Sequence, residues 1–351
     1  MNSPFIWDHN SDQPYPIKDR VYKKTMRKKY VGDYLKLFFT NLIFFPLSII
    51  VMKFFKKKQL IDKSFYGIGV NLDKGDTQQA LVEELGVKSL LIRLPLSDME
   101  NIDAYVEFAK SFGSDKEIVI NLLQDREHID NPRLLAQDIE IIFTKFHDIT
   151  LEYQVGNAIN RTKWGFFAMQ EYLEFFTTIQ TIRDETFPTI TLIAPSIIDF
   201  EYYYTIRTLF NNYNLTYDKS SALLYVDRRG SPYNTQMGIF DTKNKINMLY
   251  ALIRLSPKTK SDALYITEVN WPLINTAPYA PTSEYECVDE ESYSQYMLEY
   301  FDIAAQSGKV DKVFWHQLVA NGYGLVDTRN GELRKREAFY KFRDSVASVQ
   351  S

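Results

Sequence analysis

Cysteine and histidine are scarce in this chain, and their scarcity excludes several kinds of site. Among 351 residues there is one cysteine, Cys287, which rules out an intrachain disulfide framework and a cysteine-rich metal site. The four histidines, His9, His128, His147 and His316, lack the His-Glu-x-x-His spacing of zinc enzymes. We therefore expect no metal and no other cofactor. The redox compartment stays open, with a lean toward the cytoplasm.

A surplus of positive charge is missing as well. The 41 Lys and Arg residues face 45 Asp and Glu residues, and the formal net charge is −4. This balance argues against nucleic acid as a partner, because that role needs a basic face. Apolar residues are plentiful, at 45% of the chain, and aromatic residues make up 15%. This composition fits a large packed core, and it equally fits stacking surfaces for sugars.

The first 58 residues differ from the rest of the chain. Residues 1–34 are a polar tail with a basic cluster at Lys23, Lys24, Arg27, Lys28 and Lys29. Residues 35–58 are a hydrophobic run that ends in three lysines and predicts a membrane-associating helix. The helix either lies on or re-enters the membrane, spans it, or is an amphipathic cap that packs on the main domain. On the first two interpretations the lysines favour anionic lipid, and we expect the cytoplasmic face of a bacterial inner membrane.

Residues 64–348 repeat one unit, a short apolar strand followed by a helix with apolar residues at 3.6-residue spacing. The predicted strands are Tyr66–Asn71, Ser89–Leu94, Glu117–Leu122, Leu151–Val155, Ile190–Ala194, Ala222–Val226, Leu264–Thr267 and Lys312–Gln317. Eight such units predict an α/β fold, a (β/α)8 TIM barrel. An open doubly wound sheet is the alternative, but no Gly-x-Gly-x-x-Gly motif follows the first strand.

Polar side chains stand where the predicted strands end, which is the end of a barrel that carries chemistry. The seventh strand delivers Glu268 just where its apolar run stops. A strand-ending Glu that is solvated or paired with a Lys is the structural alternative. The other strand ends supply Arg93, Gln124 with Asp125, Asn157, Asp227 with Arg228 and Arg229, and His316 beside Trp315. So many polar groups at one rim predict a functional cleft.

Two of these strand ends resemble motifs of the retaining glycoside hydrolases of clan A. Residues 156–160, Gly-Asn-Ala-Ile-Asn, look like the clan's strand-four motif Gly-Asn-Glu-Pro-Asn, in which the Glu is the acid/base. Glu268, in Thr-Glu-Val-Asn-Trp, resembles the strand-seven nucleophile. Arg93 matches the clan's arginine that keeps the nucleophile ionised, and Trp315 matches the aromatic floor of the sugar site. The resemblance covers roughly residues 64–345 and implies a carbohydrate-active barrel.

The sequence departs from the clan at Ala158, which stands where the resemblance places the acid/base. Retaining hydrolysis normally uses two carboxyl groups about 5 to 5.5 Å apart, and Ala cannot donate a proton. Asp227 or Asp125 could supply the proton from across the cleft. Alternatively, the leaving group could be a phosphate that needs no acid, held by basic side chains, namely Arg161, Lys163, Arg228 and Arg229.

A third interpretation is a non-catalytic glycan-binding barrel, a pseudo-glycosidase with Trp164, Trp271 and Trp315 as stacking platforms. The sequence thus predicts a membrane-associated, glycosidase-like protein that acts on a cell-envelope glycan or another oligosaccharide or polysaccharide. Glu268 is the expected nucleophile or base. The expected substrate-binding residues are Arg93, Gln124, Asn157, Arg161, Arg228, Trp271, Trp315 and His316.

Overall fold

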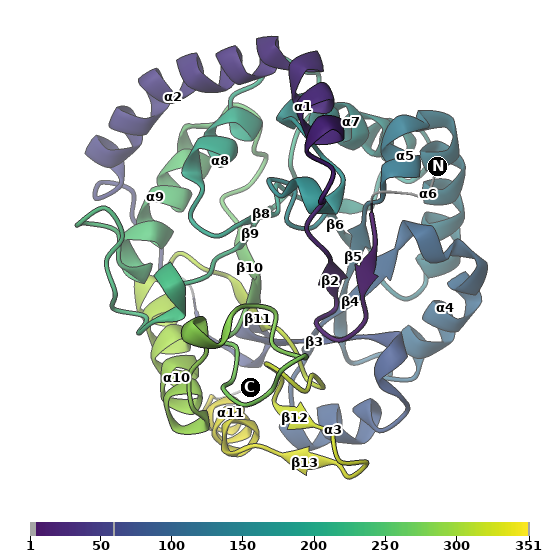
Figure 1. Cartoon of the computed structure of the whole chain (residues 1–351), viewed down its shortest axis with the longest axis vertical. Coiled ribbons are helices and arrows are strands. Elements are labelled where there is room, and N and C mark those ends of the chain that lie inside the picture. The colour runs from purple at the N-terminus through teal and green to yellow at the C-terminus, as the bar shows by residue number, and fades with distance from the viewer. Residues whose placement is uncertain (1–4, 59, 350–351) are drawn as a thin grey trace.

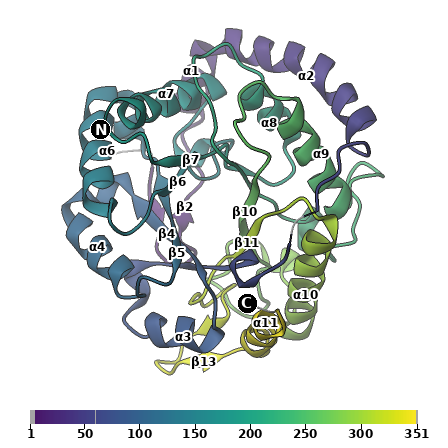
Figure 2. The same ribbon diagram turned by 180° about the vertical axis from the view of Figure 1, so that it is seen from behind.

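A curled parallel sheet surrounded by helices forms the centre of the computed structural model, which describes residues 5–58 and 60–349 (Figures 1 and 2). The strands of the curled sheet are β3 (Tyr66–Val70), β4 (Ser89–Pro95), β5 (Glu117–Leu123), β6 (Glu152–Val155), β7 (Thr191–Ile193), β8 (Ile197–Ile198), β9 (Ser220–Leu223), β10 (Leu264–Val269) and β11 (Lys312–Trp315). All eight predicted strands are present. The short β8 is an additional strand that follows β7 in the chain and pairs with β9. The predicted fold class is confirmed.

Neighbouring strands pair in parallel, in the order β7-β6-β5-β4-β3-β11-β10-β9-β8. The two edges meet, because a bridge joins Ile193 to Lys219 and the amide of Ala194 donates to the Lys219 carbonyl at 3.1 Å. Inside the sheet, Phe314 packs with apolar side chains from four other strands. Gly67 makes room for that ring, since a Cβ there would lie 2.4 Å from it.

Helices cover the outside of the sheet, and they follow one another in sequence order. The outer helices are α3 (Gln78–Leu85), α4 (Ile102–Lys110), α6 (Pro132–Phe146), α7 (Met169–Thr186), α8 (Tyr202–Leu209), α9 (Thr242–Leu255), α10 (Glu290–Ser307) and α11 (Glu337–Ser348), with the short α5 (Arg126–Asp130) before α6. The last helix lies where the sequence predicted it. A small hairpin of β12 (Val326–Asp327) and β13 (Arg334–Lys335) precedes it.

The predicted hydrophobic helix is α2 (Val31–Val51), which begins and ends earlier than expected. It lies along α8 and α9 on the outside of the barrel (Figure 1). Phe44 stacks on Phe210, and the buried Asp33 carboxylate accepts hydrogen bonds from Arg207 at 2.6 and 3.0 Å. If the helix spanned a membrane, its apolar surface would be uncovered by the rest of the chain. One face is instead packed on the barrel.

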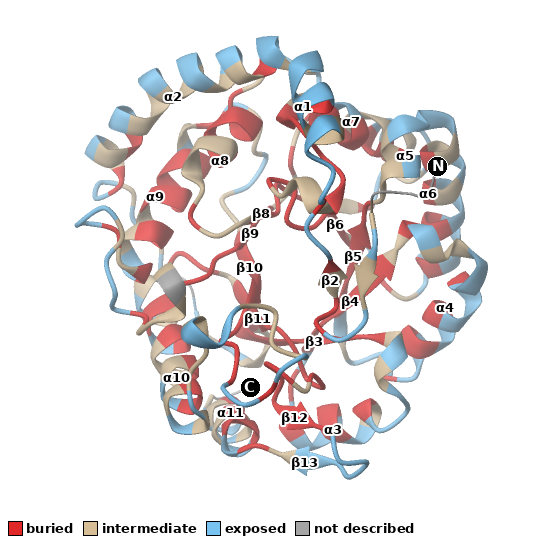
Figure 3. Cartoon of the chain, in the orientation of Figure 1, coloured by how far each residue is buried: buried red, intermediate tan, exposed pale blue. Residues whose placement is uncertain are grey.

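The opposite face of α2 is an apolar stripe open to solvent (Figure 3). Every member of the apolar stripe is at least 36% exposed: Val31, Leu35, Phe38, Phe39, Leu42, Ile43, Leu47 and Ile50. By length and composition α2 could cross a membrane, and no membrane is part of the structure. Exposed apolar surface on this scale is rare on a soluble monomer.

Residues 5–30 are more ordered than the predicted polar tail. Strands β1 (Trp7–Asp8) and β2 (Gln13–Pro14) pair as an antiparallel hairpin, and α1 (Arg20–Lys29) follows. The hairpin lies over the middle of the barrel (Figure 1), and Ser11, Asp12 and Ile17 are buried. This arrangement could not be predicted, because strands of two residues show no periodicity.

Candidate active site

Glu268 reaches the cleft because strand β10 contains a bulge. The pairing of β10 with β11 shifts between Ile266 and Val269, so that one extra residue stands on β10. Ile266 and Val269 both face the outer hydrophobic core, and the bulge lets the intervening carboxylate turn inward. Glu268 is only 7% exposed.

Two side chains hold the Glu268 carboxylate, one on each oxygen. The Arg93 guanidinium on β4 donates to Oε2 at 2.6 Å, and the Tyr225 hydroxyl donates to Oε1 at 2.6 Å. The two side chains predicted to lie together at the rim are therefore hydrogen-bonded. The sequence pattern did not predict a role for Tyr225, because it stands within an apolar run, before the polar residues at the strand end.

The charges around Glu268 keep it ionised. Burial opposes the charge, but His316, Arg93 and Tyr225 together lower the pKa of Glu268 to about 2. His316 is itself buried and lies near the Arg93 charge, which lowers its own pKa to about 3. His316 is therefore neutral at neutral pH, and there Arg93 and the Tyr225 hydrogen bond stabilise the carboxylate.

A network of amide side chains continues the site along β5 and β6. Gln124 donates to the carbonyls of Asn157 and Trp164 at 2.8 and 2.9 Å, and it accepts from the Asn157 amide at 2.8 Å. Asn121 donates to Asn157 at 3.1 Å. Within the described residues, the buried Arg93 Nε and Asn157 Nδ2 have no hydrogen-bond partner. Such donors suit the hydroxyl groups of a sugar.

Apolar side chains surround Ala158. It is fully buried, with φ of 45°, and it packs in a cluster with Leu123, Trp164, Leu223 and Tyr225. Trp7 of the N-terminal hairpin packs against the same cluster and meets Trp164 edge to face, with ring centroids 5.7 Å apart. The volume beside Ala158 is therefore filled with apolar groups.

Two of the three tryptophans predicted to stack on sugar lie in the outer core of the barrel. Trp271 and Trp315 are both fully buried in the outer core, where their rings stack with centroids 5.9 Å apart. The period of two along a strand explains the error: Phe314 faces the inside of the barrel, so Trp315 faces the helices. Trp315 donates to the Tyr293 hydroxyl at 2.8 Å, which fixes it there.

The candidate proton donors Asp125 and Asp227 are not among the hydrogen-bond partners found for Glu268. Asp125 caps α5, since it accepts from the His128 amide at 3.0 Å and meets the His128 ring at 2.7 Å. Asp227 begins a short helical turn, η5 (Asp227–Arg229), after β9. Neither geometry supports the predicted proton transfer.

Two members of the predicted phosphate-binding cluster already have partners within the chain. Arg161 forms ion pairs with Asp199 and, at 2.7 Å, with Glu201, so its charge is already compensated. Arg229 donates to Asn270 at 2.8 Å and stacks over Tyr225. The side chain of Arg228 lies outside the described residues.

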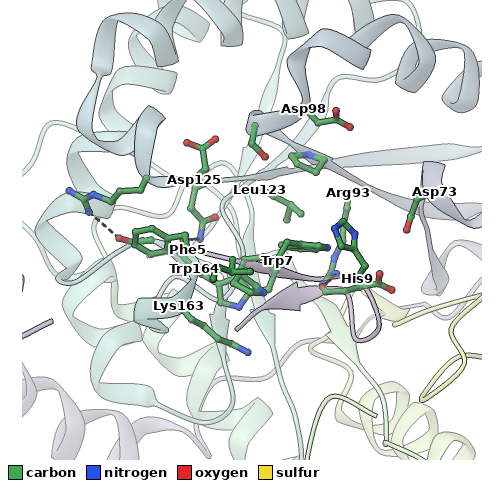
Figure 4. Close-up of a pocket in the computed structure, with 18 of the residues that line it drawn as sticks. Phe5, Trp7, His9, Asp73, Arg93, Asp98, Leu123, Asp125, Lys163 and Trp164 are labelled. Carbon is green, nitrogen blue, oxygen red and sulfur yellow. Dashed lines mark hydrogen bonds between the residues drawn. The ribbon is translucent and has the colours of Figure 1, made fainter. Parts of the chain in front are cut away.

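Lys163 follows β6 and lines a cavity of about 600 Å³ beside the hairpin (Figure 4). Burial and the nearby Arg161 lower its pKa to about 8. The cavity is also lined by Arg93, Trp164 and Asp125, but Glu268 does not reach it. The hairpin residues Phe5 and Trp7 form part of its wall, as the close-up shows.

The fold has counterparts among solved structures. A family 51 arabinofuranosidase from Xanthomonas axonopodis pv. citri aligns with a TM-score of 0.59 and 13% identity, over 82% of this chain and 73% of that one. A family 30 subfamily 8 xylanase from Clostridium acetobutylicum gives 0.56 and 12%, over 84% and 74%. A family 39 β-xylosidase from Caulobacter crescentus gives 0.57 and 12%, over 84% and 74%. No family model and no curated protein matches the chain.

These similarities establish the fold that the sequence resemblance implied. The three counterparts are glycoside hydrolases, and what this chain shares with them is the barrel architecture. At 12 to 13% identity the likeness shows the architecture alone.

The buried neutral His316 predicts a specific pH dependence of stability. Its pKa falls from 6.5 to about 3 on folding, so between these values the unfolded chain binds a proton that the folded chain does not. Stability should therefore fall as the pH is lowered through this window, by up to about 1.4 kcal/mol per pH unit. In chemical denaturation, His316→Gln should flatten this slope. His147→Gln, at an exposed position, is the control; equal slopes in all three chains would contradict the assignment.

Proposed function

We propose that this protein is a carbohydrate-active enzyme of the glycoside hydrolase kind, with Glu268 as its nucleophile. The observation that carries the proposal is a buried carboxylate kept ionised by Arg93 and Tyr225, at the end of a barrel strand where glycosidase chemistry is built. The glycosidase fold of the structural counterparts supports it.

In this proposal Glu268 attacks the anomeric carbon of a bound sugar while the bond to the leaving oxygen breaks. Water then cleaves the glycosyl ester and restores the carboxylate. Arg93 keeps Glu268 negative before the attack, and the unpartnered donors of Arg93 and Asn157 hold sugar hydroxyls. As an alternative, Glu268 acts as a base that activates water.

The apolar cluster around Ala158 decides what kind of leaving group departs. Ala158 has no proton to give and is packed among apolar side chains, so a good leaving group, such as a phosphate or an acidic phenol, is favoured. Lys163 is an alternative proton source, because its pKa of about 8 lets it hold a proton at neutral pH. Transfer from a sugar phosphate through Arg161 is less well supported, because Arg161 is paired.

We further propose that the protein acts at a membrane surface. The apolar stripe of α2 is exposed, and the basic residues of α1 precede it. Since the other face of α2 packs on the barrel through Phe44, Asp33 and Asn41, the helix suits a position lying on the membrane. Anionic lipid is the expected partner, and a cell-envelope glycan is the expected substrate.

Turnover should depend on Glu268 and on the leaving group. Aryl glycosides with acidic phenols should be hydrolysed while alkyl glycosides stay inert, because general acid catalysis, worth about 10² to 10⁴ in rate, is missing. Glu268→Gln should lower kcat roughly 10⁴-fold or more, the scale of losing a nucleophile. Glu107→Gln, exposed on α4, is the matched control.

A flat dependence on the leaving-group pKa would show instead that a side chain supplies the proton. Lys163→Met and Asp227→Asn would then identify which one. Full activity in Glu268→Gln would reject the proposed nucleophile.

Membrane binding should depend on the apolar stripe. In flotation with vesicles that contain anionic lipid, the native chain should bind, and the triple variant Phe38→Ser, Phe39→Ser, Ile43→Ser should stay in solution. Ile141→Ser, at an exposed apolar residue of α6, should bind like the native chain. Equal flotation of all three proteins would show that the stripe is not the membrane-binding surface.

A further inference from the structure

The N-terminal hairpin places a carboxylate inside the proposed glycan site. Asp12 lies at the hairpin turn, is 6% exposed and has a left-handed backbone with φ of 51°. Its carboxylate accepts hydrogen bonds from Lys74 at 2.8 Å, Gln317 at 2.9 Å and Tyr323 at 3.0 Å. All three donors belong to the barrel, and none is near Asp12 in the sequence.

Arg93 connects this carboxylate site to the proposed nucleophile. One nitrogen of the guanidinium donates to the main-chain oxygen of Asp12 at 3.1 Å, and the other donates to Glu268 at 2.6 Å. A ligand that replaced the hairpin turn would therefore lie directly beside Glu268, with its acidic group among Lys74, Gln317 and Tyr323.

The Gln317 amide and the Tyr323 hydroxyl need a hydrogen-bond acceptor, and Lys74 needs a negative charge. The Lys74 side chain is only 17% exposed, and although burial opposes its charge, Asp12 and Asp73 raise its pKa above the ordinary value. If the hairpin turn left, Lys74 would keep only Asp73, which is largely exposed. The buried Tyr323 hydroxyl would lose both of its acceptors, Asp12 and the Ser11 carbonyl, and the Gln317 amide would keep only the Tyr323 hydroxyl, at 3.4 Å. A second carboxylate in the same place would satisfy all three.

The hairpin could leave the barrel without opening the main hydrophobic core. Its strands have two residues each, and none of residues 5–18, all of which the structure describes, belongs to the main hydrophobic core. Its attachments besides Asp12 are few. Trp7 packs near Ala158, Ile17 packs in a small cluster with Met26 and Phe167, and Gln13 donates to the Pro281 carbonyl at 3.1 Å and accepts from Lys163. The cavity of about 600 Å³ on its other side has the size of a small-molecule site.

We propose that residues 5–18 are an intramolecular plug of the glycan site, and that Lys74, Gln317 and Tyr323 form a subsite for the carboxylate of an acidic sugar, a uronate. Asp12 occupies this subsite in the plugged chain, and a uronate displaces it. The proposal deepens the proposed function and rests on the site around Glu268. Because the plug is tethered, it competes at a high effective concentration and lowers the apparent affinity for free sugar.

The direct test compares sugar binding in the native chain and in Asp12→Asn. Asn tolerates the left-handed backbone at this position, so the charge is removed without new strain. The probes are D-glucuronic and D-galacturonic acid, with D-glucose and D-galactose as neutral partners and glucose 6-phosphate as the other anion. Asp12→Asn should bind at least one uronate about tenfold more tightly than the native chain does, as expected if the plug fills the site about nine-tenths of the time. The neutral sugars should show no such gain.

Two further variants make the result specific. Adding Lys74→Gln to Asp12→Asn should remove the gain for the uronate, and Asn10→Ala, at an exposed position of the hairpin, should bind like the native chain. Thermal unfolding of each variant verifies that it is folded. A second measurement uses the native chain alone: the uronate should speed hydrogen exchange of the Tyr15 amide, which donates to the Ile6 carbonyl across the hairpin at 2.8 Å.

Several results would overturn the proposal. These are no tighter uronate binding in Asp12→Asn, an equal gain for the neutral sugars, unchanged exchange at Tyr15, or glucose 6-phosphate bound as tightly as the uronates. All of these tests measure binding without turnover. A chain with no hydrolytic activity can therefore still support the subsite, and an active glycosidase that ignores the carboxylate refutes the subsite alone.

Discussion

The Arg93 guanidinium is the group on which the rest of the site depends. It is 6% exposed and bonds both Glu268 and the main chain of Asp12, so it holds the proposed nucleophile and the proposed plug at once. A buried cation of this kind is tolerated only with an ion-pair partner, and removing either partner of such a pair costs about 3 to 5 kcal/mol. The strands β4 and β10 must therefore present these two residues at the same height, and the bulge in β10 meets that requirement.

The N-terminal arm connects the site to the outside of the molecule. The hairpin ends at the barrel mouth, α1 follows it, and α2 then crosses α8 and α9 with its apolar stripe outward (Figure 1). One continuous stretch of chain thus carries both the proposed plug and the proposed membrane contact. A protein on an anionic surface would hold α1 and α2 against lipid while the hairpin remains free to leave the cleft.

Sequence patterns predicted the strands of the barrel, because apolar runs are local features, and the resemblance to clan A implied the meeting of Arg93 with Glu268. The predicted position of Trp315 was wrong, because a shift of one residue along a strand moves a side chain to the opposite face. A role for Tyr225 was not predicted, because it stands within an apolar run and not among the polar residues at the strand end. The role of Asp12 could not be predicted, because its partners lie between 62 and 311 positions away in the chain.

The proposed function depends on Glu268 being a nucleophile in a site without a conventional acid. The most direct measurement is covalent trapping with 2-deoxy-2-fluoro glycosides that carry a dinitrophenolate leaving group, which departs without protonation, in the sugar series that the protein hydrolyses. We predict that the trapped chain gains the mass of one fluoroglycosyl unit, located on the peptide that contains Glu268, and that Glu268→Gln gains none. Label on another residue, or hydrolysis of the parent aryl glycoside with no label at Glu268, would contradict the account.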